Sequence, residues 1–451
     1  IWRGGIRDHL GGGLARYSTD RRWLLPHFEK MLYDQALMLY ALAECREAGE
    51  DPLLDAFAAD LAGFVLGEMA APEGGFCSAT GADGEGEEGG YYLWTEEDVR
   101  AALPPEKAGI FICAYGIRKG GNVKNERTGR ILGDNVLHIP EPRERTAARF
   151  ALSPEELEAV LASCRATLLA ERNRRPRPPL DDKILADWNG LFITALAEAS
   201  LIFGNMAWAD AATRAFSEAL NLFWKDNRLL HSHRGGSTRH EGTADDYASL
   251  IAAALALHAL TGDATYIAKA QELTAALEHN HWDTAEGGFY HASQKHTTLP
   301  IKSRTIEDDA TPNANSVMIR NYNSLYQLTG NDSYKIRAEK IVEAFAAAAA
   351  DILGDELLIL NSGPVASAVR ASCAFPGVFT PVEVEGRLLV DGGLINNLPV
   401  SAARDLGAET LVREMRRRLA VFANGAEQSD DITILCFRYG ARSAKASIQT
   451  F

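Results

Sequence analysis

The sequence predicts a mainly α-helical fold of repeated helix pairs, arranged as a ring or a solenoid and followed by a small α/β tail. Three observations lead to this prediction: helical periodicity dominates residues 27–350, the same short turn recurs four times between apolar helices, and no strong run of alternating residues marks a sheet. The chain has 451 residues, which exceeds one typical domain. Two or more structural units are therefore expected.

Each recurring turn contains a glycine next to an Asp or Asn. The four turns lie at residues 48–51, 203–205, 261–263 and 329–331. Glycine can take the left-handed conformation that ends one helix, and Asp or Asn then caps the next helix. The turns therefore predict αα-hairpins.

A polar or glycine-rich loop follows the second helix of three pairs. These loops lie at residues 73–76, 225–228 and 286–290. The order helix, tight turn, helix, long loop is typical of rings and solenoids of helix pairs. Two insertions are expected to interrupt the repeat, at about residues 72–94 and 118–150. An irregular helical bundle is the alternative.

The first helix of each pair begins with polar and aromatic residues, where a helix that only packs would be apolar. The clusters are residues 33–35, 188–190, 245–247 and 313–316. If the first helices form an inner ring, these starts meet at one mouth of a central cavity, where carboxylates, amides and aromatic rings together suit a sugar. Helix capping is the alternative for the polar residues, but it does not explain Trp188 and Tyr247.

The composition narrows the function classes. With 46 Lys and Arg against 61 Asp and Glu, the net charge is −15, which disfavours binding to nucleic acid. Six scattered cysteines without a CxxC pattern or metal-like spacing predict buried, reduced thiols. No metal or other cofactor is expected. No apolar stretch approaches ~20 residues, and no charged leader precedes one, so no membrane span and a cytoplasmic location are expected.

The first 40 residues carry a dense motif. Residues 4–20 read GGIRDHLGGGLARYSTD, and residues 26–36 read PHFEKMLYDQA. This resembles the spermatogenesis-associated, YyaL-type family, in which a thioredoxin-fold domain precedes a helical toroid. Further matches occur in the family's order at residues 83–94, 135–138, 181–191, 245–248 and 310–316. The resemblance covers about residues 1–350.

The resemblance implies an (α/α)6 toroid over residues 1–353, of the kind shared with N-acylglucosamine 2-epimerases and six-hairpin glycosidases. The family's thioredoxin-like domain and the toroid's opening helices are expected to be missing, so the ring is expected to be incomplete. Such a ring exposes apolar helix faces, which favours self-association. Gly81 stands where the family usually has an acidic residue, and Asn313-Ala314 stands where Ser-Gly is typical.

Residues 354–412 resemble the C-terminal part of a patatin-like phospholipase. The resemblance rests on the motif Asp391-Gly392-Gly393 and its surroundings, and it implies that Asp391 is the aspartate of a Ser-Asp dyad. The dyad also needs a serine on a G-x-S-x-G turn and backbone donors for the oxyanion, and the sequence contains neither motif. A lipid acyl hydrolase is therefore disfavoured.

Residues 413–451 resemble the last strands of a metal-dependent phosphatase of the PP2C or SpoIIE type. The remaining acidic motifs of that family are absent, so no metal is expected at Asp430 and Asp431. Three family fragments in one chain suggest a fused or chimeric reading frame.

The leading functional hypothesis is a carbohydrate-active or carbohydrate-binding toroid whose partner is a small-molecule sugar. Epimerisation or isomerisation needs two proton-transfer groups beside a carbon next to a carbonyl. His9 and His27 are the catalytic candidates for it, and His138 lies in a third matched motif. Glycoside hydrolysis instead needs two carboxylates. The candidates for these are Asp34, Asp245 and Asp246.

Ten further residues are expected to bind the substrate, because they lie in the polar helix starts or in the matched motifs. They are Arg16, Tyr33, Asp83, Glu85, Trp94, Asp182, Trp188, Asn189, Tyr247 and Asn315. The contrasting hypothesis is an inactive toroid scaffold without turnover.

Overall fold

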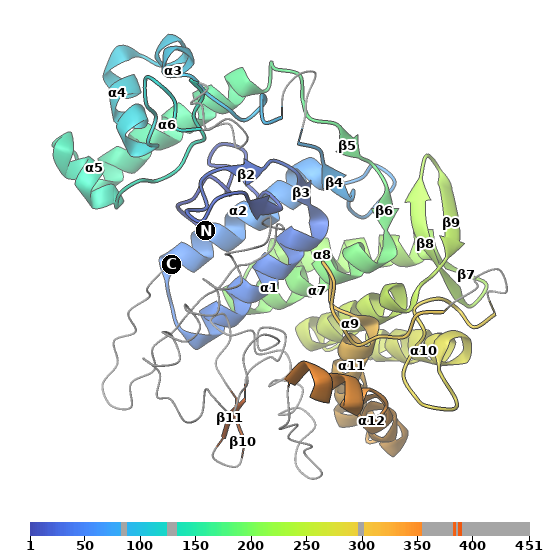
Figure 1. Cartoon of the computed structure of the whole chain (residues 1–451). Helices are drawn as coiled ribbons and strands as arrows, with labels where there is room; N and C mark the ends of the chain where they lie inside the picture. The colour runs from blue at the N-terminus through green and yellow to red at the C-terminus, as the bar shows by residue number, and fades with distance from the viewer. Residues whose placement is uncertain (83–87, 124–132, 296–301, 354–381, 385–386, 390–451) are drawn as a thin grey trace, which may run out of the picture. The chain divides into compact units, whose positions relative to one another are not determined.

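The computed structural model describes residues 1–82, 88–123, 133–295, 302–353, 382–384 and 387–389. In this part of the chain the fold is mainly α, with consecutive helices paired and short strands between the pairs (Figure 1), which confirms the predicted class. None of the described helices is both long and apolar enough to cross a membrane. Some predicted residues fall outside the described residues; they are Asp83, Glu85, Asp391, Asp430 and Asp431.

The chain divides into two compact units. The first comprises residues 1–46, 50–223 and 232–239, and the second comprises residues 47–49, 224–231 and those from 240 onward. The helices of the first unit are α1 (Leu32–Ala48), α2 (Pro52–Phe64) with the π-helical turn η1 (Val65–Met69), α3 (Glu96–Ala102), α4 (Pro105–Ala114), α5 (Arg143–Arg149), α6 (Pro154–Arg172), α7 (Ala186–Phe203) and α8 (Met206–Phe223). The helices of the second unit are α9 (Ala244–Thr261), α10 (Ala264–His281), α11 (Ala314–Thr329) and α12 (Asp332–Leu353).

The strands are short and pair antiparallel. In the first unit β1 (Tyr17–Ser18) pairs with β2 (Pro26–His27), and β4 (Ala79–Thr80) lies between β3 (Lys30–Met31) and β5 (Leu180–Asp181). Strand β8 (Arg228–Arg234) forms a hairpin with β9 (Ser237–Glu241) and also pairs with β6 (Ile184–Leu185) and β7 (Trp224–Lys225). Strands β10 (Val382–Val384) and β11 (Arg387–Leu389) form a separate pair.

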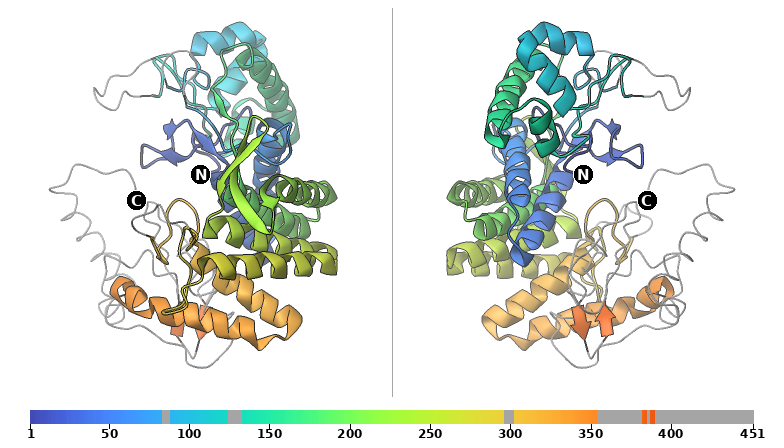
Figure 2. Two further views of the ribbon diagram at one scale, coloured as in Figure 1. Left: turned by 90° about the vertical axis from the view of Figure 1, so that its right-hand side faces the viewer. Right: turned by 90° about the vertical axis from the view of Figure 1, so that its left-hand side faces the viewer.

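Three of the four predicted turns are built as expected. Gly204, Gly262 and Gly330 each end a helix with φ between 67° and 72°. The Asp or Asn that follows each glycine accepts a hydrogen bond from the backbone N–H two residues further on. Helix α7 therefore packs on α8, α9 on α10 and α11 on α12 (Figure 1, Figure 2).

The first turn differs from the other three. Asp51 caps α2 by accepting a hydrogen bond of 2.9 Å from the N–H of Leu53, as predicted, but Gly49 does not adopt the left-handed conformation. A left-handed glycine that ends one helix and an Asp or Asn that caps the next are thus separate features, and this turn has only the cap.

Helix α9 packs against both α10 and α11. It therefore buries apolar residues around most of its circumference, and these include Leu250, Ile251 and Leu257, each fully buried. Because α9 and α11 are the first helices of consecutive pairs, their contact is what an inner layer of first helices requires.

The first unit contains an apolar core away from its paired helices α7 and α8. It is formed by α3, α4 and α6 around residues such as Phe111 and Leu161, both fully buried. The segment 118–150, expected as an insertion, includes α5 and contributes Leu137 and Ile139 to this core.

Candidate functional site

A repeated contact organises the loops in front of the first helices. At the start of α7, the side-chain amide of Asn189 forms two hydrogen bonds with the backbone of Phe76. It accepts one from the N–H of Phe76 (2.8 Å) and donates one to the carbonyl of Phe76 (3.0 Å). At the start of α11, Asn315 makes the same two bonds to Phe289 (2.7 and 3.1 Å). Both asparagines are almost fully buried.

Two other helix starts use different side chains for the same purpose. Gln35 in α1 binds the N–H and carbonyl of Leu14, both at 2.8 Å, and the hydroxyl of Tyr247 in α9 accepts the N–H of Leu229 at 2.9 Å. We call these four side chains the loop clamp. Two consecutive residues with positive φ immediately precede three of the clamped residues, namely Gly12-Gly13, Gly74-Gly75 and Gly287-Gly288. A fourth such pair, Asp226-Asn227, lies one residue further from Leu229.

The loop clamp explains three of the residues predicted to bind substrate. Asn189 and Asn315 use their amides on backbone groups, and Tyr247 uses its hydroxyl in the same way. A buried backbone N–H needs such a partner, so these side chains position the loops.

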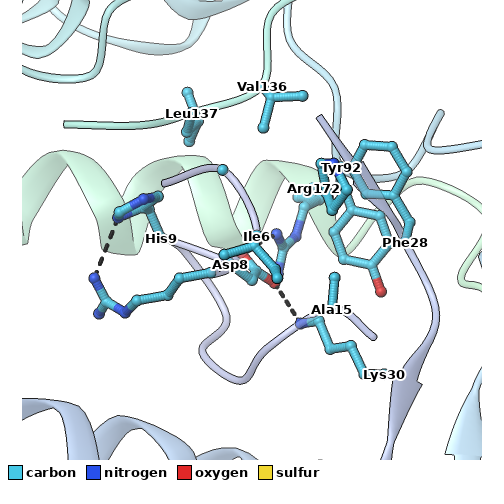
Figure 3. Close-up of a pocket in the computed structure, with 13 residues that line it drawn as sticks. Ile6, Asp8, His9, Ala15, Phe28, Lys30, Tyr92, Val136, Leu137 and Arg172 are labelled. Carbon is cyan, nitrogen blue, oxygen red and sulfur yellow. Dashed lines mark hydrogen bonds and ion pairs between the residues drawn. The ribbon is translucent and has the colours of Figure 1, made fainter. Parts of the chain in front are cut away.

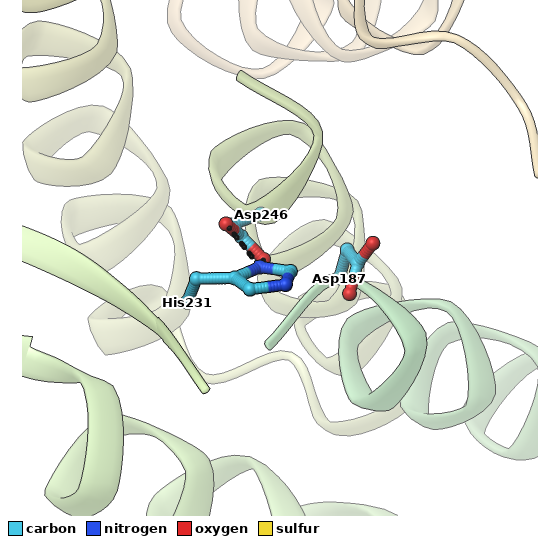
Figure 4. Close-up of side chains that lie close together, drawn as sticks. All are labelled: Asp187, His231 and Asp246. Carbon is cyan, nitrogen blue, oxygen red and sulfur yellow. Dashed lines mark hydrogen bonds and ion pairs between the residues drawn. The ribbon is translucent and has the colours of Figure 1, made fainter. Parts of the chain in front are cut away.

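The start of α9 carries two Asp-His pairs on consecutive residues. Both carboxylate oxygens of Asp246 lie 3.0 Å from Nδ1 of His231 (Figure 4). Oδ2 of Asp245 lies 2.8 Å from Nδ1 of His291. Successive side chains on a helix point about 100° apart, which lets the two carboxylates hold two different imidazoles.

Both carboxylates are also fixed by backbone donors. Oδ2 of Asp246 accepts the N–H of Thr243 (2.7 Å) in a capping box, and this aspartate is fully buried. Oδ1 of Asp245 accepts the N–H of Ala314 (2.7 Å) at the start of α11. A carboxylate held in this way orients the imidazole it binds and favours the tautomer with the proton on Nδ1.

The two imidazoles remain accessible. The side chain of His231 is 28% exposed and that of His291 is 52% exposed. The hydrogen bond to Asp245 raises the pKa of His291, while burial and the nearby His231 oppose this effect. His291 therefore keeps its proton to a higher pH than a free imidazole.

The pKa of the third histidine of this region shifts in the opposite direction. His281 packs edge-on against Tyr247, its Nδ1 lies 3.0 Å from the carbonyl of Tyr290, and burial lowers its pKa. It is therefore a neutral core residue.

In the first unit, four of the predicted residues lie together. The rings of Tyr33 and Trp188 meet edge to face with centroids 4.7 Å apart. Oδ2 of Asp34 is buried without a hydrogen-bond partner, and burial raises the pKa of Asp34 to about 7 although Arg16 opposes this. The cluster combines an aromatic wall with a carboxyl group that titrates near neutral pH.

The three other histidines predicted from motifs have varied environments. His9 is buried, with Nε2 at 2.8 Å from the carbonyl of Gly4, and burial lowers its pKa well below the usual range. Burial also lowers the pKa of His138. His27 contacts Glu29 (3.1 Å) and Glu88 (2.7 Å).

The two remaining predicted residues lie apart from these clusters. Trp94 is a core residue with 1% exposure, and its backbone bridges that of Asn135. Asp182 is half exposed and pairs with Arg234.

His231 and His291 were not predicted, although the sequence holds a signal for both. Each lies two residues after a clamped residue, Leu229 or Phe289, and Arg16 follows Leu14 by the same spacing. Side chains two residues apart in extended backbone point to the same side. An alignment of the loops on their clamped residues would have selected these positions.

Comparisons with known proteins find two separate groups of similar proteins. Human spermatogenesis-associated protein 20 is 32% identical over 371 residues, which cover 76% of this chain and 47% of that protein, and the rat protein is 31% identical over 372 residues with the same coverage. The chain thus spans about half the length of the curated relatives it matches. These proteins are close homologues of this chain over the matched residues.

A second set of matches involves different proteins. The family described as Patatin-like phospholipase matches residues 247–404. An uncharacterised NTE family protein of Mycobacterium tuberculosis is 35% identical over 108 residues, which cover 20% of this chain and 28% of that protein.

Two solved structures show a distant similarity to this chain. Cellobiose 2-epimerase from Bacillus thermoamylovorans has a TM-score of 0.47 at 10% identity and covers 76% of this chain and 67% of its own. The GH76 alpha-mannanase BT2949 of Bacteroides thetaiotaomicron has a TM-score of 0.37 at 12% identity, with coverage of 70% and 61%.

Proposed function

We propose that this chain, a homologue of spermatogenesis-associated protein 20 over its helical part, binds a carbohydrate and transfers protons on it with two Asp-His pairs. The observation that carries the proposal is that Asp245 and Asp246, consecutive residues of α9, orient the imidazoles of His291 and His231. A sugar is the expected substrate because the sequence resembles a family whose toroid is shared with sugar 2-epimerases. Residues 413–451 have no part in this proposal.

Two oriented imidazoles suit epimerisation or isomerisation. A base removes the proton from the carbon beside a carbonyl, and an acid returns a proton to that carbon or to its neighbour. The raised pKa of His291 suits the acid, and His231, whose Nδ1 faces Asp246, suits the base.

The same contacts argue against the hydrolytic alternative. A glycosidase needs one carboxyl group as the acid and a second as the nucleophile or base. Asp245 and Asp246 already bind imidazole nitrogens and backbone N–H groups, and Asp246 is fully buried. They are therefore better suited to orienting histidines than to attacking a glycosidic bond.

The match to the patatin-like family does not add a second function. An acyl hydrolase needs a nucleophilic serine on a G-x-S-x-G turn, and the printed sequence contains no such motif. Asp391 alone could not form an acyl-enzyme.

Deuterium incorporation tests the proposal directly. The full chain is incubated in ²H₂O with neutral, N-acetylated and acidic sugars, and exchange at the carbon beside the carbonyl is followed by NMR. We expect exchange into at least one class, and a loss of about 100-fold or more in His231→Asn and His291→Asn.

A matched control comes from the other end of α9. His258 binds the carbonyl of Asp263 at 3.0 Å and lies at the last turn of the helix, so His258→Asn should retain the exchange rate. Absence of exchange with every sugar would reject catalysis and favour the inactive scaffold. Equal exchange in all three variants would reject the assignment to the Asp-His pairs.

A further inference from the structure

A small pocket in the first unit is surrounded by charged side chains that the proposed function does not use. Asp8 lies between two cations, 2.8 Å from Nζ of Lys30 and 2.8 Å from Nη1 of Arg172 (Figure 3). All three side chains are at most 6% exposed. The pocket has a volume of about 30 Å³, which is enough for a small ion or for water.

The charges around this pocket do not balance. Arg7 is paired with Asp60 at 2.7 Å, so these two neutralise each other. Asp8 neutralises only one of Lys30 and Arg172. An excess positive charge in a buried site is costly unless an anion accompanies it.

The nearby histidine does not alter this balance. His9 also lines the pocket, and burial together with Arg7 lowers its pKa well below the usual range, so it is neutral. Burial also lowers the pKa of Lys30, and Asp8 opposes this effect. With Lys30 and Arg172 both protonated, the surroundings of the pocket carry one net positive charge.

An unsatisfied donor provides a second, independent observation. Nε of Arg172 is buried and has no hydrogen-bond partner. The side chain of Arg172 is only 4% exposed, and it lines the pocket. Native proteins satisfy nearly all buried donors, and a charged donor is the most costly to leave unpaired. Nζ of Lys30, by contrast, donates to Asp8 and to the carbonyl of Gly12 (2.7 Å).

The glycines of the N-terminal motif make room for this arrangement. A Cβ atom on Gly11 would lie 2.2 Å from Nη2 of Arg172, and one on Gly13, whose φ is +78°, would lie 2.6 Å from the ring of Phe64. The ring of Phe64 in turn lies 4.4 Å from Nζ of Lys30. The glycine run thus allows the two cations to lie close to the backbone.

We propose that this pocket binds one small monovalent anion, such as chloride, between Lys30 and Arg172. The anion accepts the ε N–H of Arg172 and balances the excess charge. It thereby fixes the glycine-rich segment 11–13 against α6, independently of any sugar.

Equilibrium dialysis of the full chain with radiolabelled chloride tests this proposal. We expect one saturable chloride per chain, which bromide displaces. Lys30→Met keeps the length of the side chain but removes the excess charge, and it should abolish saturable binding. Lys183→Met removes an exposed lysine paired with Asp181 and should leave binding unchanged.

A second variant covers the case in which Lys30→Met does not fold. Arg172→Lys keeps the charge but removes the ε N–H, and it should weaken chloride binding about tenfold or more. Thermal unfolding of the wild type in mixtures of chloride and gluconate at fixed ionic strength should show a saturable rise of Tm with chloride.

Two outcomes would overturn the proposal. The first is a wild-type chain without saturable chloride, which means that water fills the pocket. The second is undiminished binding in folded Lys30→Met or in Arg172→Lys, which places the ion elsewhere. Loss of sugar exchange has no bearing on either outcome, so the two proposals can fail separately.

Discussion

Burial of one carboxyl oxygen controls the chemistry of Asp34. Its Oδ2 lacks a hydrogen-bond partner, and the nearby Arg16 does not compensate for the loss of water, so burial raises the pKa of Asp34 to about 7. Two side chains of this protein thus have raised pKa values, the buried carboxyl of Asp34 in the first unit and the imidazole of His291 in the second. Groups of this kind are typical of functional sites.

Asp34 should make the protein less stable as the pH rises. Below pH 4 the carboxyl is protonated in both the folded and the unfolded chain. Between pH 4 and 7 only the unfolded chain ionises, so the free energy of unfolding falls, on the order of 4 kcal/mol in total, and then levels off. Asp34→Asn removes the titration and should be more stable than the wild type at pH 8.

Urea unfolding at pH 5 and pH 8 measures this difference. Asp55→Asn, in an exposed ion pair with Arg46, is the control, and its stability should follow that of the wild type at both pH values. If Asp34→Asn and the wild type lose stability equally over this range, Asp34 ionises normally.

The pKa of His291 depends on its carboxylate partner. Because the hydrogen bond to Asp245 is the main cause of the raised pKa, Asp245→Asn should lower it, which an NMR titration of the imidazole protons measures. Glu272→Gln removes an exposed carboxylate paired with Lys269 in α10 and should leave the titration unchanged. An unaltered pKa in Asp245→Asn would contradict the orienting role of Asp245.

At the scale of elements, the loop clamp links each first helix to a loop that lies elsewhere in the sequence. Asn189 and Phe76 are 113 residues apart, and Asn315 and Phe289 are 26 residues apart, yet their hydrogen bonds are the same. What repeats along the chain is therefore the contact between a helix start and a loop backbone, and different side chains can make this contact. Gln35 and Tyr247 show this, since neither resembles asparagine in size.

Removal of one clamp should cost more than removal of a helix cap. Asn315→Ala leaves the backbone groups of Phe289 without partners in a buried site and should lower the free energy of unfolding by about 3 kcal/mol. Asn313→Ala, which removes the N-cap of the same helix, should cost about 1 kcal/mol. Chemical denaturation compares the two, and equal losses would mean that the clamp acts only as a cap.

The glycines before the clamp are expected to be intolerant of a side chain. Gly75 has φ +72°, and a Cβ there would lie 2.9 Å from Oδ1 of Asn189, so Gly75→Ala should destabilise by at least about 1–2 kcal/mol. Gly109 lies inside α4 with no atom near its missing Cβ, so Gly109→Ala should stabilise by about 0.5–1 kcal/mol. Thermal unfolding distinguishes the two, and a stabilised Gly75→Ala would refute the clash.

These contacts show which features the sequence could predict. The turns at Gly204, Gly262 and Gly330 were predictable because a left-handed glycine and an adjacent cap are local signals. The polar helix starts were also recognised, but helix periodicity cannot tell whether Asn189 faces a ligand or a distant loop. That distinction depends on tertiary contacts.

The histidines of the site were missed for a related reason. His231 and His291 lie in loops and short strands, where no helical period ranks one position above another. Motif resemblance led instead to His9 and His138, whose lowered pKa values reflect burial. Only the spacing from the clamped residues would have identified the accessible pair.

At the scale of the whole molecule, two resemblances overlap. The homology to spermatogenesis-associated protein 20 covers 76% of the chain, whereas the patatin-like match begins at residue 247, inside α9, and continues to residue 404. The hairpins α9 to α12 and the loop clamp belong to the helical repeat, which extends to Leu353. Within the second unit, α9 packs on α10 and α11, and α11 packs on α12, so packing groups the helices between residues 244 and 353 together.

Limited proteolysis with intact-mass analysis of the fragments tests this boundary. If α12 closes the helical part, the protected core should end near residues 350–356, because beyond that point no described helix packs on α11 or α12. Protection that extends to about residue 404 would instead mean that the patatin-like segment folds together with α9 to α12, and the boundary at residue 353 would be wrong. The first result would also justify sugar assays on residues 1–353 alone, since both Asp-His pairs lie within them.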